Sequence, residues 1–221
     1  MQELHTKVDH FLESILIPEN DLYQNILDFS HESGLPEISI SPSQGKFLQL
    51  LVYATGAKNI LEIGTLGGYS AIWMAKGLPK EGKLFTCEFD PKHVEVAKIN
   101  VKRAECDLKI EILPGDAKAS LNKLLEKKVT PFDLIFIDAD KESYPTYLEL
   151  SLKLSRTGTL IIGDNMIRKG QIIDDESSDL RVQQTRNFLK MIGSDQRLLG
   201  STAIQTVGSK GYDGFSLSIV K

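Results

Sequence analysis

The middle of the chain alternates short apolar runs with stretches of helical pattern, and this alternation limits the possible folds more than any other feature. The expected strands are Asn59–Ile63, Lys83–Glu88, Lys109–Leu113, Phe132–Asp138 and Gly158–Gly163, and the expected helices between them are Tyr69–Gly77, Lys92–Glu105, Ala117–Lys127 and Thr146–Leu154. Continuous apolar runs such as residues 134–137 are typical of parallel strands covered on both faces by helices. We therefore predict an α/β fold with a doubly wound, Rossmann-like, mostly parallel sheet.

The start of the chain has a different pattern. Two amphipathic helices are expected over Leu4–Ile17 and Asn20–Glu32, with Pro18 at the break between them. Ser41 followed by Pro42 is a typical helix start and predicts a third helix. We assign residues 1–40 to a helical extension and residues 41–221 to the main domain.

The end of the chain predicts an antiparallel addition to the sheet. After a helix at Leu180–Ile192, two strand-like stretches, Arg197–Val207 and Gly214–Val220, flank a turn over Gly208–Gly214. Such a pair is typical of a hairpin. With it, the expected sheet has seven strands and an antiparallel C-terminal edge.

Charge and cysteine content limit the classes of binding partner and the cellular compartment that we expect for this chain. The 221 residues carry 26 Lys and Arg against 30 Asp and Glu, a net charge of −4, which gives no general attraction to nucleic acid or acidic membranes. The first residues lack the cationic and apolar segments of a signal peptide, and the sequence has no apolar run of membrane-spanning length. Only two cysteines are present. We expect a cytoplasmic protein with neither a nucleic-acid nor a membrane partner.

An acidic residue follows or ends each of the first five predicted strands. These residues are Glu62, Glu88, Asp116, Asp138 and Asp164. Ligands of open α/β sheets bind at the carboxyl ends of the strands. The pattern therefore predicts a site for a ligand that carries hydroxyls and cationic groups.

A glycine-rich loop, Gly64–Gly68, follows the first strand. A dinucleotide-binding loop needs a second glycine where Leu66 stands, and Glu62 suits a cationic ligand group better than a pyrophosphate. Glu88 lies 24 residues after Gly64, about where a ribose-binding acid is expected. The favoured ligand is S-adenosylmethionine. A tight turn without a ligand is the alternative.

A second group of residues follows the fourth and fifth strands. Asp138, Asp164 and Asn165 would offer only oxygen ligands, which suit Mg²⁺, Mn²⁺ or Ca²⁺. Helix capping by either Asp, or an Asp-Asn turn, is the structural alternative. Lys141 lies three residues after Asp138 and is a candidate general base near such a cation, or else a solvated surface lysine.

The remaining reactive residue types are expected to be structural. The four histidines, His93 among them, lie in predicted helices away from the strand ends, so neither a zinc site nor a histidine triad is expected. Cys87 is expected to be a buried strand residue, and Trp73 to pack in the core.

The chain resembles the metal-dependent O-methyltransferases of the caffeoyl-CoA and catechol type, from about residue 41 to residue 221. The resemblance rests on residues 62–64 and 68–70, on Phe136-Ile137-Asp138-Ala139-Asp140-Lys141, on Asp164-Asn165 and on Gly211–Ile219. It implies a homodimer that transfers a methyl group from S-adenosylmethionine to a hydroxyl of a catechol-type acceptor.

The resemblance also implies a role for each matching residue. The cofactor-binding set is predicted to be Ser41, Glu62, Gly64, Thr65, Ser70, Glu88, Asp116, Ala117, Asp138, Asp140 and Tyr147. Within it, Glu88 would take the ribose hydroxyls and Asp140 the amino group of the methionine part. The metal ligands would be Asp138, Asp164 and Asn165. The predicted catalytic residues are Lys141, as the base, and Asp138.

The loop after the predicted metal ligands departs from the family. Met166–Gly170 stands where plant caffeoyl-CoA enzymes carry a tryptophan and an asparagine, so specificity for coenzyme A esters does not transfer. Arg168 and Lys169 either meet an anionic acceptor or are solvated loop charges, and the second interpretation is favoured.

Two other classes of function are weighed against the methyltransferase. A nicotinamide-dependent oxidoreductase could use a similar sheet, but Leu66 argues against it. A non-catalytic binding module is the other alternative, and the intact set of Asp138, Lys141, Asp164 and Asn165 argues against it.

Overall fold

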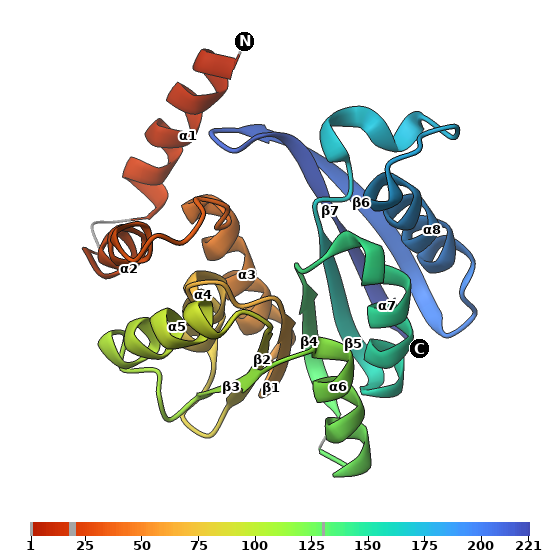
Figure 1. Cartoon of the computed structure of the whole chain (residues 1–221), viewed down its shortest axis with the longest axis horizontal. Coiled ribbons are helices and arrows are strands. Elements are labelled where there is room, and N and C mark those ends of the chain that lie inside the picture. Colours follow the sequence, from red (N-terminus) through yellow and green to blue (C-terminus); the bar gives the residue numbers. More distant parts are fainter. Residues whose placement is uncertain (1, 18–20, 130) are drawn as a thin grey trace.

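A mixed sheet of seven strands runs through the computed structural model, which describes residues 2–17, 21–129 and 131–221 (Figure 1). Its strand order is β3-β2-β1-β4-β5-β7-β6. The strands are β1 (Asn59–Ile63), β2 (Lys83–Glu88), β3 (Ile110–Pro114), β4 (Phe132–Ile137), β5 (Ser155–Asp164), β6 (Leu198–Gly208) and β7 (Gly211–Val220). Strands β1 to β5 are parallel, whereas β7 is antiparallel to β5 and β6. The predicted α/β class, strand number and antiparallel edge are confirmed.

The register brings the carboxyl ends of the central strands level with one another. Ile63 at the end of β1 pairs with Cys87 in β2 and with Ile137 in β4. Ile137 in turn pairs with Gly163 in β5. The chain runs outward from β1 to β2 and β3 on one side and continues with β4 and β5 on the other. The strand order thus reverses between β1 and β4. In open α/β sheets, ligands bind in the crevice at this reversal, which is called the topological switch point.

Helices cover both faces of the sheet (Figure 1). Helices α3 (Pro42–Thr55), α4 (Tyr69–Gly77) and α5 (Pro91–Arg103) share one apolar core with the strand residues Leu134 and Phe136. Helices α6 (Ala117–Glu126), α7 (Tyr144–Lys153) and α8 (Leu180–Ser194) share the other core with Ile135 and Ile137. Alternate residues of β4 therefore enter opposite cores, which explains its continuous apolar sequence.

Two helices precede this domain. Helix α1 (Gln2–Leu16) has no buried residue, whereas Tyr23, Ile26 and Ser30 of α2 (Asp21–Glu32) are buried. Tyr23 stacks on Trp73 of α4, with ring centroids 3.5 Å apart. Helix α2 is thus packed on the main domain. The predicted break at Pro18 lies outside the described residues.

Helix α1 lies at one end of the molecule, where it meets the tip of the β6–β7 hairpin and contacts α3 (Figure 1). The Gln2 side chain donates a hydrogen bond to the Gly208 carbonyl (2.6 Å), and the Ser209 N–H donates to the Asp9 carboxylate (2.6 Å). Polar contacts therefore fix its position beside the hairpin.

The predicted hairpin turn over Gly208–Gly214 was too long. Gly208 pairs with Gly211, so only Ser209 and Lys210 form the turn. The strand begins at Gly211 rather than at the predicted Gly214, and Gly214 pairs with Gln205 of β6. A Cβ at Gly214 would collide with the Ile204 carbonyl of β6. Glycine in this position permits close strand contact rather than a turn.

Within the described ranges, no helix is long and apolar enough to cross a membrane. The cytoplasmic location stays a prediction.

Candidate active site

A cavity of about 1000 Å³ opens at the carboxyl ends of the strands. Most of the predicted site residues line it, namely Gly64, Thr65, Ser70, Glu88, Asp116, Ala117, Asp138, Asp140, Lys141, Tyr147, Asp164 and Asn165. Two predicted residues, Ser41 and Glu62, are not among its lining residues. The fold therefore brings residues from the ends of five strands, β1 to β5, to one space.

The glycine loop begins where β1 approaches β4 most closely. Gly64 has φ +105°, and a Cβ there would collide with the carbonyl of Asp138. Leu66, two residues later, adopts φ +50°, a left-handed conformation that is uncommon for leucine. The missing glycine of a dinucleotide-binding loop is thus replaced by a residue held in a glycine-like conformation.

Glu88 at the end of β2 fastens this loop. Its carboxylate accepts hydrogen bonds from the N–H groups of Leu66 (2.7 Å), Thr65 (3.3 Å) and Asp90 (2.9 Å). The carboxylate also lines the cavity. It can hold the loop through some of its lone pairs and offer others to a ligand.

His93 was wrongly placed away from the strand ends. Its Nδ1 lies 3.3 Å from the Glu88 carboxylate, and its side chain lines the cavity. Asp90 caps α5 through its bonds to the Lys92 and His93 N–H groups. The first turn of α5, and His93 with it, therefore starts beside the end of β2. A capping Asp two residues after Glu88 was the sequence signal that could have located it.

Glu62 lies beneath the cavity. It is fully buried, and its carboxyl group meets the Ser70 and Thr86 hydroxyls, each at 2.5 Å. Burial raises its pKa to about 8, although these two hydrogen bonds oppose the shift. Ser70 does line the cavity, so Glu62 would act on a ligand through Ser70.

Hydrogen-bond counting around Glu62 also favours the protonated acid. The Thr86 hydroxyl contacts both Glu62 (2.5 Å) and the Thr65 hydroxyl (2.6 Å), and Thr65 also donates to the Cys87 carbonyl (3.0 Å). These three contacts need three protons, but the two threonine hydroxyls supply only two. A proton on Glu62 completes the chain.

Two of the other predicted cofactor residues contact each other, and two lie at a helix start. Asp140 accepts a 2.5 Å hydrogen bond from the Tyr147 hydroxyl, and both side chains line the cavity. Asp116 caps α6 by accepting from the Lys118 N–H (3.0 Å), and Ala117 is the first residue of that helix. Ser41 likewise caps α3 through the Gln44 N–H (3.1 Å), while Gln44 itself lines the cavity.

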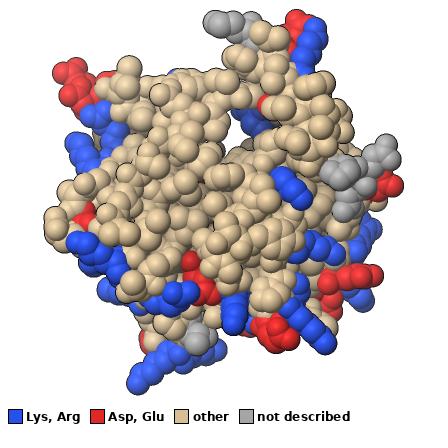
Figure 2. Space-filling model, turned by 180° about the vertical axis from the view of Figure 1, so that it is seen from behind, with Lys and Arg blue, Asp and Glu red and all other residues tan. Residues whose placement is uncertain are grey.

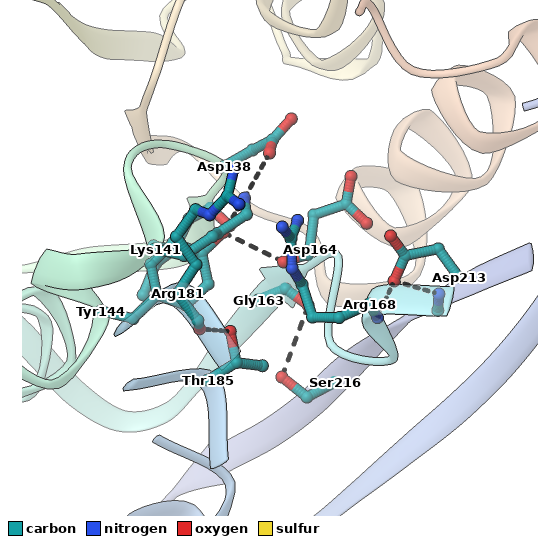
Figure 3. A network of polar contacts seen from close by, with 12 residues as sticks. Asp138, Lys141, Tyr144, Gly163, Asp164, Arg168, Arg181, Thr185, Asp213 and Ser216 are labelled. Atoms are coloured by element: carbon teal, nitrogen blue, oxygen red, sulfur yellow. Dashed lines mark hydrogen bonds and ion pairs between the residues drawn. The ribbon is translucent and has the colours of Figure 1, made fainter. Parts of the chain in front are cut away.

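Asp138, Asp164 and Asn165 lie at the ends of the neighbouring strands β4 and β5 (Figure 3). Asp164 is 5% exposed, whereas the Asp138 side chain is 25% exposed. Burial raises the pKa of Asp164 to about 7, and the nearby charge of Asp138 adds to the shift. Asn165 has φ +57°, a left-handed conformation that Asn tolerates better than most residues. Two carboxylates in one half-buried place favour a bound cation.

Lys141 is buried beside these acids. Its Nζ donates hydrogen bonds to the Asp138 carboxylate (3.1 Å) and to the Tyr144 hydroxyl (2.6 Å). The Tyr144 hydroxyl lies 3.0 Å from the carbonyl of Ile137 and 3.0 Å from that of Asp164. Lys141 is therefore not a solvated surface lysine.

The sequence analysis missed Tyr144. Its ring is fully buried between the two strand ends, and Lys141 lies over it at 4.6 Å (Figure 3). It fixes Lys141 to the backbone of both β4 and β5 through one hydroxyl. The signal was its position at the start of α7, three residues after Lys141, on the same side of a helical turn.

Comparison with known proteins identifies the family. Residues 14–214 match the family model described as O-methyltransferase. The chain belongs to the O-methyltransferase family. It is 48% identical over 219 residues to a catechol O-methyltransferase of Niastella koreensis, covering 99% of each chain. It is 44% identical over 214 residues to a catechol O-methyltransferase of Mycobacterium tuberculosis, covering 97% of this chain and 95% of the other.

A solved structure agrees with this family and with the fold. The O-methyltransferase from Bacillus cereus in complex with SAH is 49% identical, and it superposes with a TM-score of 0.98 over the full length of both chains. The protein is an S-adenosylmethionine-dependent O-methyltransferase. This identification decides against an oxidoreductase and against a non-catalytic module.

The divalent cation expected from the sequence would need ligands from the residues at the ends of β4 and β5. Among the described residues, no group of three or more His, Cys, Asp or Glu side chains could hold a metal ion. The predicted set has only two carboxylates, and its third ligand is the amide of Asn165. Asp138 and Asp164 line one cavity, and the charge of Asp138 adds to the raised pKa of the buried Asp164, an arrangement that a hard cation would stabilise.

Proposed function

We propose that this O-methyltransferase methylates one hydroxyl of a catechol-type acceptor and that the reaction needs a divalent cation, with Mg²⁺ expected first and Mn²⁺ or Ca²⁺ as alternatives. One observation carries the proposal: Asp138, Asp164, Asn165 and Lys141 share a cavity with Glu88 and Asp140. The catechol O-methyltransferases among the relatives support the acceptor class.

The cofactor would lie along the carboxyl ends of β1, β2 and β4. S-Adenosylmethionine supplies an electrophilic methyl group on a sulfonium. Glu88 would accept hydrogen bonds from the ribose hydroxyls, and Asp140 would hold the cationic amino group of the methionine part. The Tyr147 hydroxyl, 2.5 Å from Asp140, orients that carboxylate. The Bacillus cereus neighbour with SAH supports this choice of cofactor.

The cation would be held by Asp138, Asp164 and Asn165. It supplies Lewis acidity that favours the ionised form of an acceptor hydroxyl. A catechol offers two adjacent oxygens to such a site, whereas a simple phenol offers one. The site therefore favours vicinal dihydroxy aromatics, phenylpropanoids included.

Lys141 would receive the hydroxyl proton at Nζ. It must be a neutral amine at that moment, and the acceptor oxygen can then attack the methyl carbon while the carbon–sulfur bond breaks. Tyr144 and Asp138 hold Nζ at the edge of the cavity. Catalysis would rest on holding oxygen and methyl group in line.

The protein is also proposed to be a homodimer. Helix α1 exposes Leu4, Phe11, Ile15 and Leu16, each 59% exposed or more. The edge strand β6 beside it exposes Leu199, Ile204 and Val207. Figure 2 shows one side of the molecule as a broad uncharged surface with Lys, Arg, Asp and Glu mainly at its margin. A second copy of the chain would cover these apolar side chains.

The proposed reaction is tested by methyl transfer to matched acceptors. Catechol and phenol are compared with S-adenosylmethionine, with and without Mg²⁺. We expect catechol to be methylated only with the metal, and phenol to react far more slowly. Equal rates for the two acceptors would contradict chelation by adjacent hydroxyls.

A further inference from the structure

Besides Lys118 and Lys141, three cationic side chains line the cavity that also contains the proposed metal ligands. Arg168 comes from the 3₁₀ segment η2 (Arg168–Ile173), Arg181 from the start of α8, and Lys210 from the β6–β7 turn. Figure 3 shows the guanidinium groups of Arg168 and Arg181 on the same side of the network as the carboxylates of Asp138 and Asp164. This side of the cavity is where an acceptor would enter.

The three cations differ in their partners. Arg181 is paired with Asp179 through two hydrogen bonds of 3.0 and 2.7 Å. Within the described part of the chain, the side chains of Arg168 and Lys210 form neither an ion pair nor a hydrogen bond. The Arg168 Nε is buried without any hydrogen-bond partner. A buried donor of this kind is costly unless something satisfies it.

Backbone strain supports a functional role for this position. Arg168 has φ +52° and Lys169 has φ +56°, left-handed backbone conformations that residues other than glycine rarely adopt. Such strain is typically kept at ligand-binding sites. Arg168 faces the cavity as a result, whereas Lys169 is exposed and is not among the lining residues.

Asp213 of β7 holds the strained segment in place. One of its carboxylate oxygens accepts hydrogen bonds from the N–H groups of Ile167, Arg168 and Gly214, each at 3.0 Å. Asp213 therefore binds the backbone of the segment rather than the Arg168 guanidinium. The charge of Arg168 also acts on Asp179, without forming an ion pair with it. Asp213 is a positioning residue for Arg168.

We propose that Arg168, with Lys210 beside the same cavity, binds an anionic substituent of the acceptor. This inference rests on the proposed methylation of a catechol-type acceptor. The substrate class becomes an acidic catechol, one that carries a carboxylate or a phosphate beyond its two hydroxyls. A guanidinium forms strong, charge-assisted hydrogen bonds with either group. For Arg168 the proposal favours contact with an anionic acceptor over the solvated loop charge preferred from the sequence. For Lys169, which is exposed, the interpretation as a solvated charge is kept.

The test compares a carboxylate-bearing acceptor with its neutral amide, a pair matched except for charge, and adds a phosphate-bearing catechol. The acceptors are 3,4-dihydroxyphenylacetate and its neutral amide, with caffeoyl-CoA as a phosphate-bearing catechol. We expect kcat/KM for at least one anionic acceptor to exceed that of the neutral amide by about tenfold or more. A preference for dihydroxyphenylacetate identifies a carboxylate near the ring, and one confined to caffeoyl-CoA identifies a phosphate.

Two variants assign the preference to the cavity. Arg168→Gln should reduce the ratio of anionic to neutral kcat/KM about tenfold, and Arg168→Lys should restore part of it. The matched control Lys169→Gln removes the neighbouring charge outside the cavity and should keep the wild-type ratio. Binding of S-adenosylmethionine, measured by calorimetry, checks that each variant is folded.

Distinct results would overturn the two proposals. Equal kcat/KM for all three acceptors in the wild-type enzyme, or a wild-type ratio in Arg168→Gln, would overturn the role of Arg168. Failure to methylate any catechol, the neutral amide included, would instead overturn the proposed function.

Discussion

At the scale of single residues, environment rather than residue type decides which acids can serve the reaction. Glu62, Asp138 and Asp164 all lie at or after the ends of apolar strands, so local pattern does not show which of them are exposed to the cavity. In the structure Glu62 is sealed beneath Ser70, whereas Asp138 and Asp164 line the cavity. The acid next to the glycine loop is thus part of the scaffold that holds the site.

The raised pKa of Glu62 predicts a pH dependence of stability. Its folded-state pKa of about 8 lies above the ordinary value of 4.5, so the folded protein keeps a proton that the unfolded chain releases. The free energy of unfolding should therefore fall as the pH rises from about 4.5 to about 8, at about 1.4 kcal/mol per pH unit from this group. Glu62→Gln should remove this slope, because its amide can keep both neighbours.

Urea unfolding at pH 5 and pH 8 measures the effect. The wild type should lose stability relative to Glu62→Gln between these two values. Glu126→Gln, a change at an exposed glutamate, is the matched control and should follow the wild type. Parallel curves for the wild type and Glu62→Gln would show that Glu62 is ionised in the folded protein.

At the scale of elements, regular patterns were predictable and side-chain directions were not. Short apolar runs located β1, β2 and β4, because strands buried on both faces are rich in apolar residues. The burial of Tyr144 and the turn of Arg168 into the cavity depend on contacts with β5 and β7, which lie far along the chain. Local sequence carries little information on such contacts.

The same limit explains the hairpin turn. Glycines at 208, 211 and 214 suggest one long turn by composition alone. Only the pairing with β6 shows that the strand starts at Gly211 and that Gly208 and Gly211 bracket a two-residue turn. The sequence therefore predicted the hairpin but not its exact length.

Helix α1 allows a prediction about assembly. The proposed dimer would bury its apolar side, so Phe11→Glu should weaken association and shift the mass in solution toward one chain. Light scattering coupled to size-exclusion chromatography measures this mass. His10→Glu places the same charge at an exposed polar position and should leave the dimer intact. A wild-type mass of one chain at micromolar concentration would contradict the proposed dimer.

At the scale of the whole molecule, the topology concentrates the chemistry. The switch in strand order at β1 and β4 gathers the ends of five strands around one cavity. A net charge of −4 says nothing of this arrangement, in which acids from the strand ends and cations from later segments line one cavity. The acids were predictable, because local sequence pattern shows where strands end. Arg168 and Lys210 come from a loop segment and a hairpin turn, whose positions only the fold determines.

The most direct test of the account is the effect of Asp164→Ala on metal-dependent methylation of catechol. Turnover is measured with Mg²⁺ and with a chelator, and the affinity for S-adenosylmethionine is measured by calorimetry. We predict that the variant loses the Mg²⁺-stimulated turnover and keeps cofactor affinity within about threefold, because Asp164 would bind the cation rather than the cofactor. Asp175→Ala, a change at an exposed acid in the loop before α8, should behave like the wild type. Wild-type turnover that is unchanged by the chelator, or Mg²⁺ stimulation that survives in Asp164→Ala, would contradict the proposed metal site.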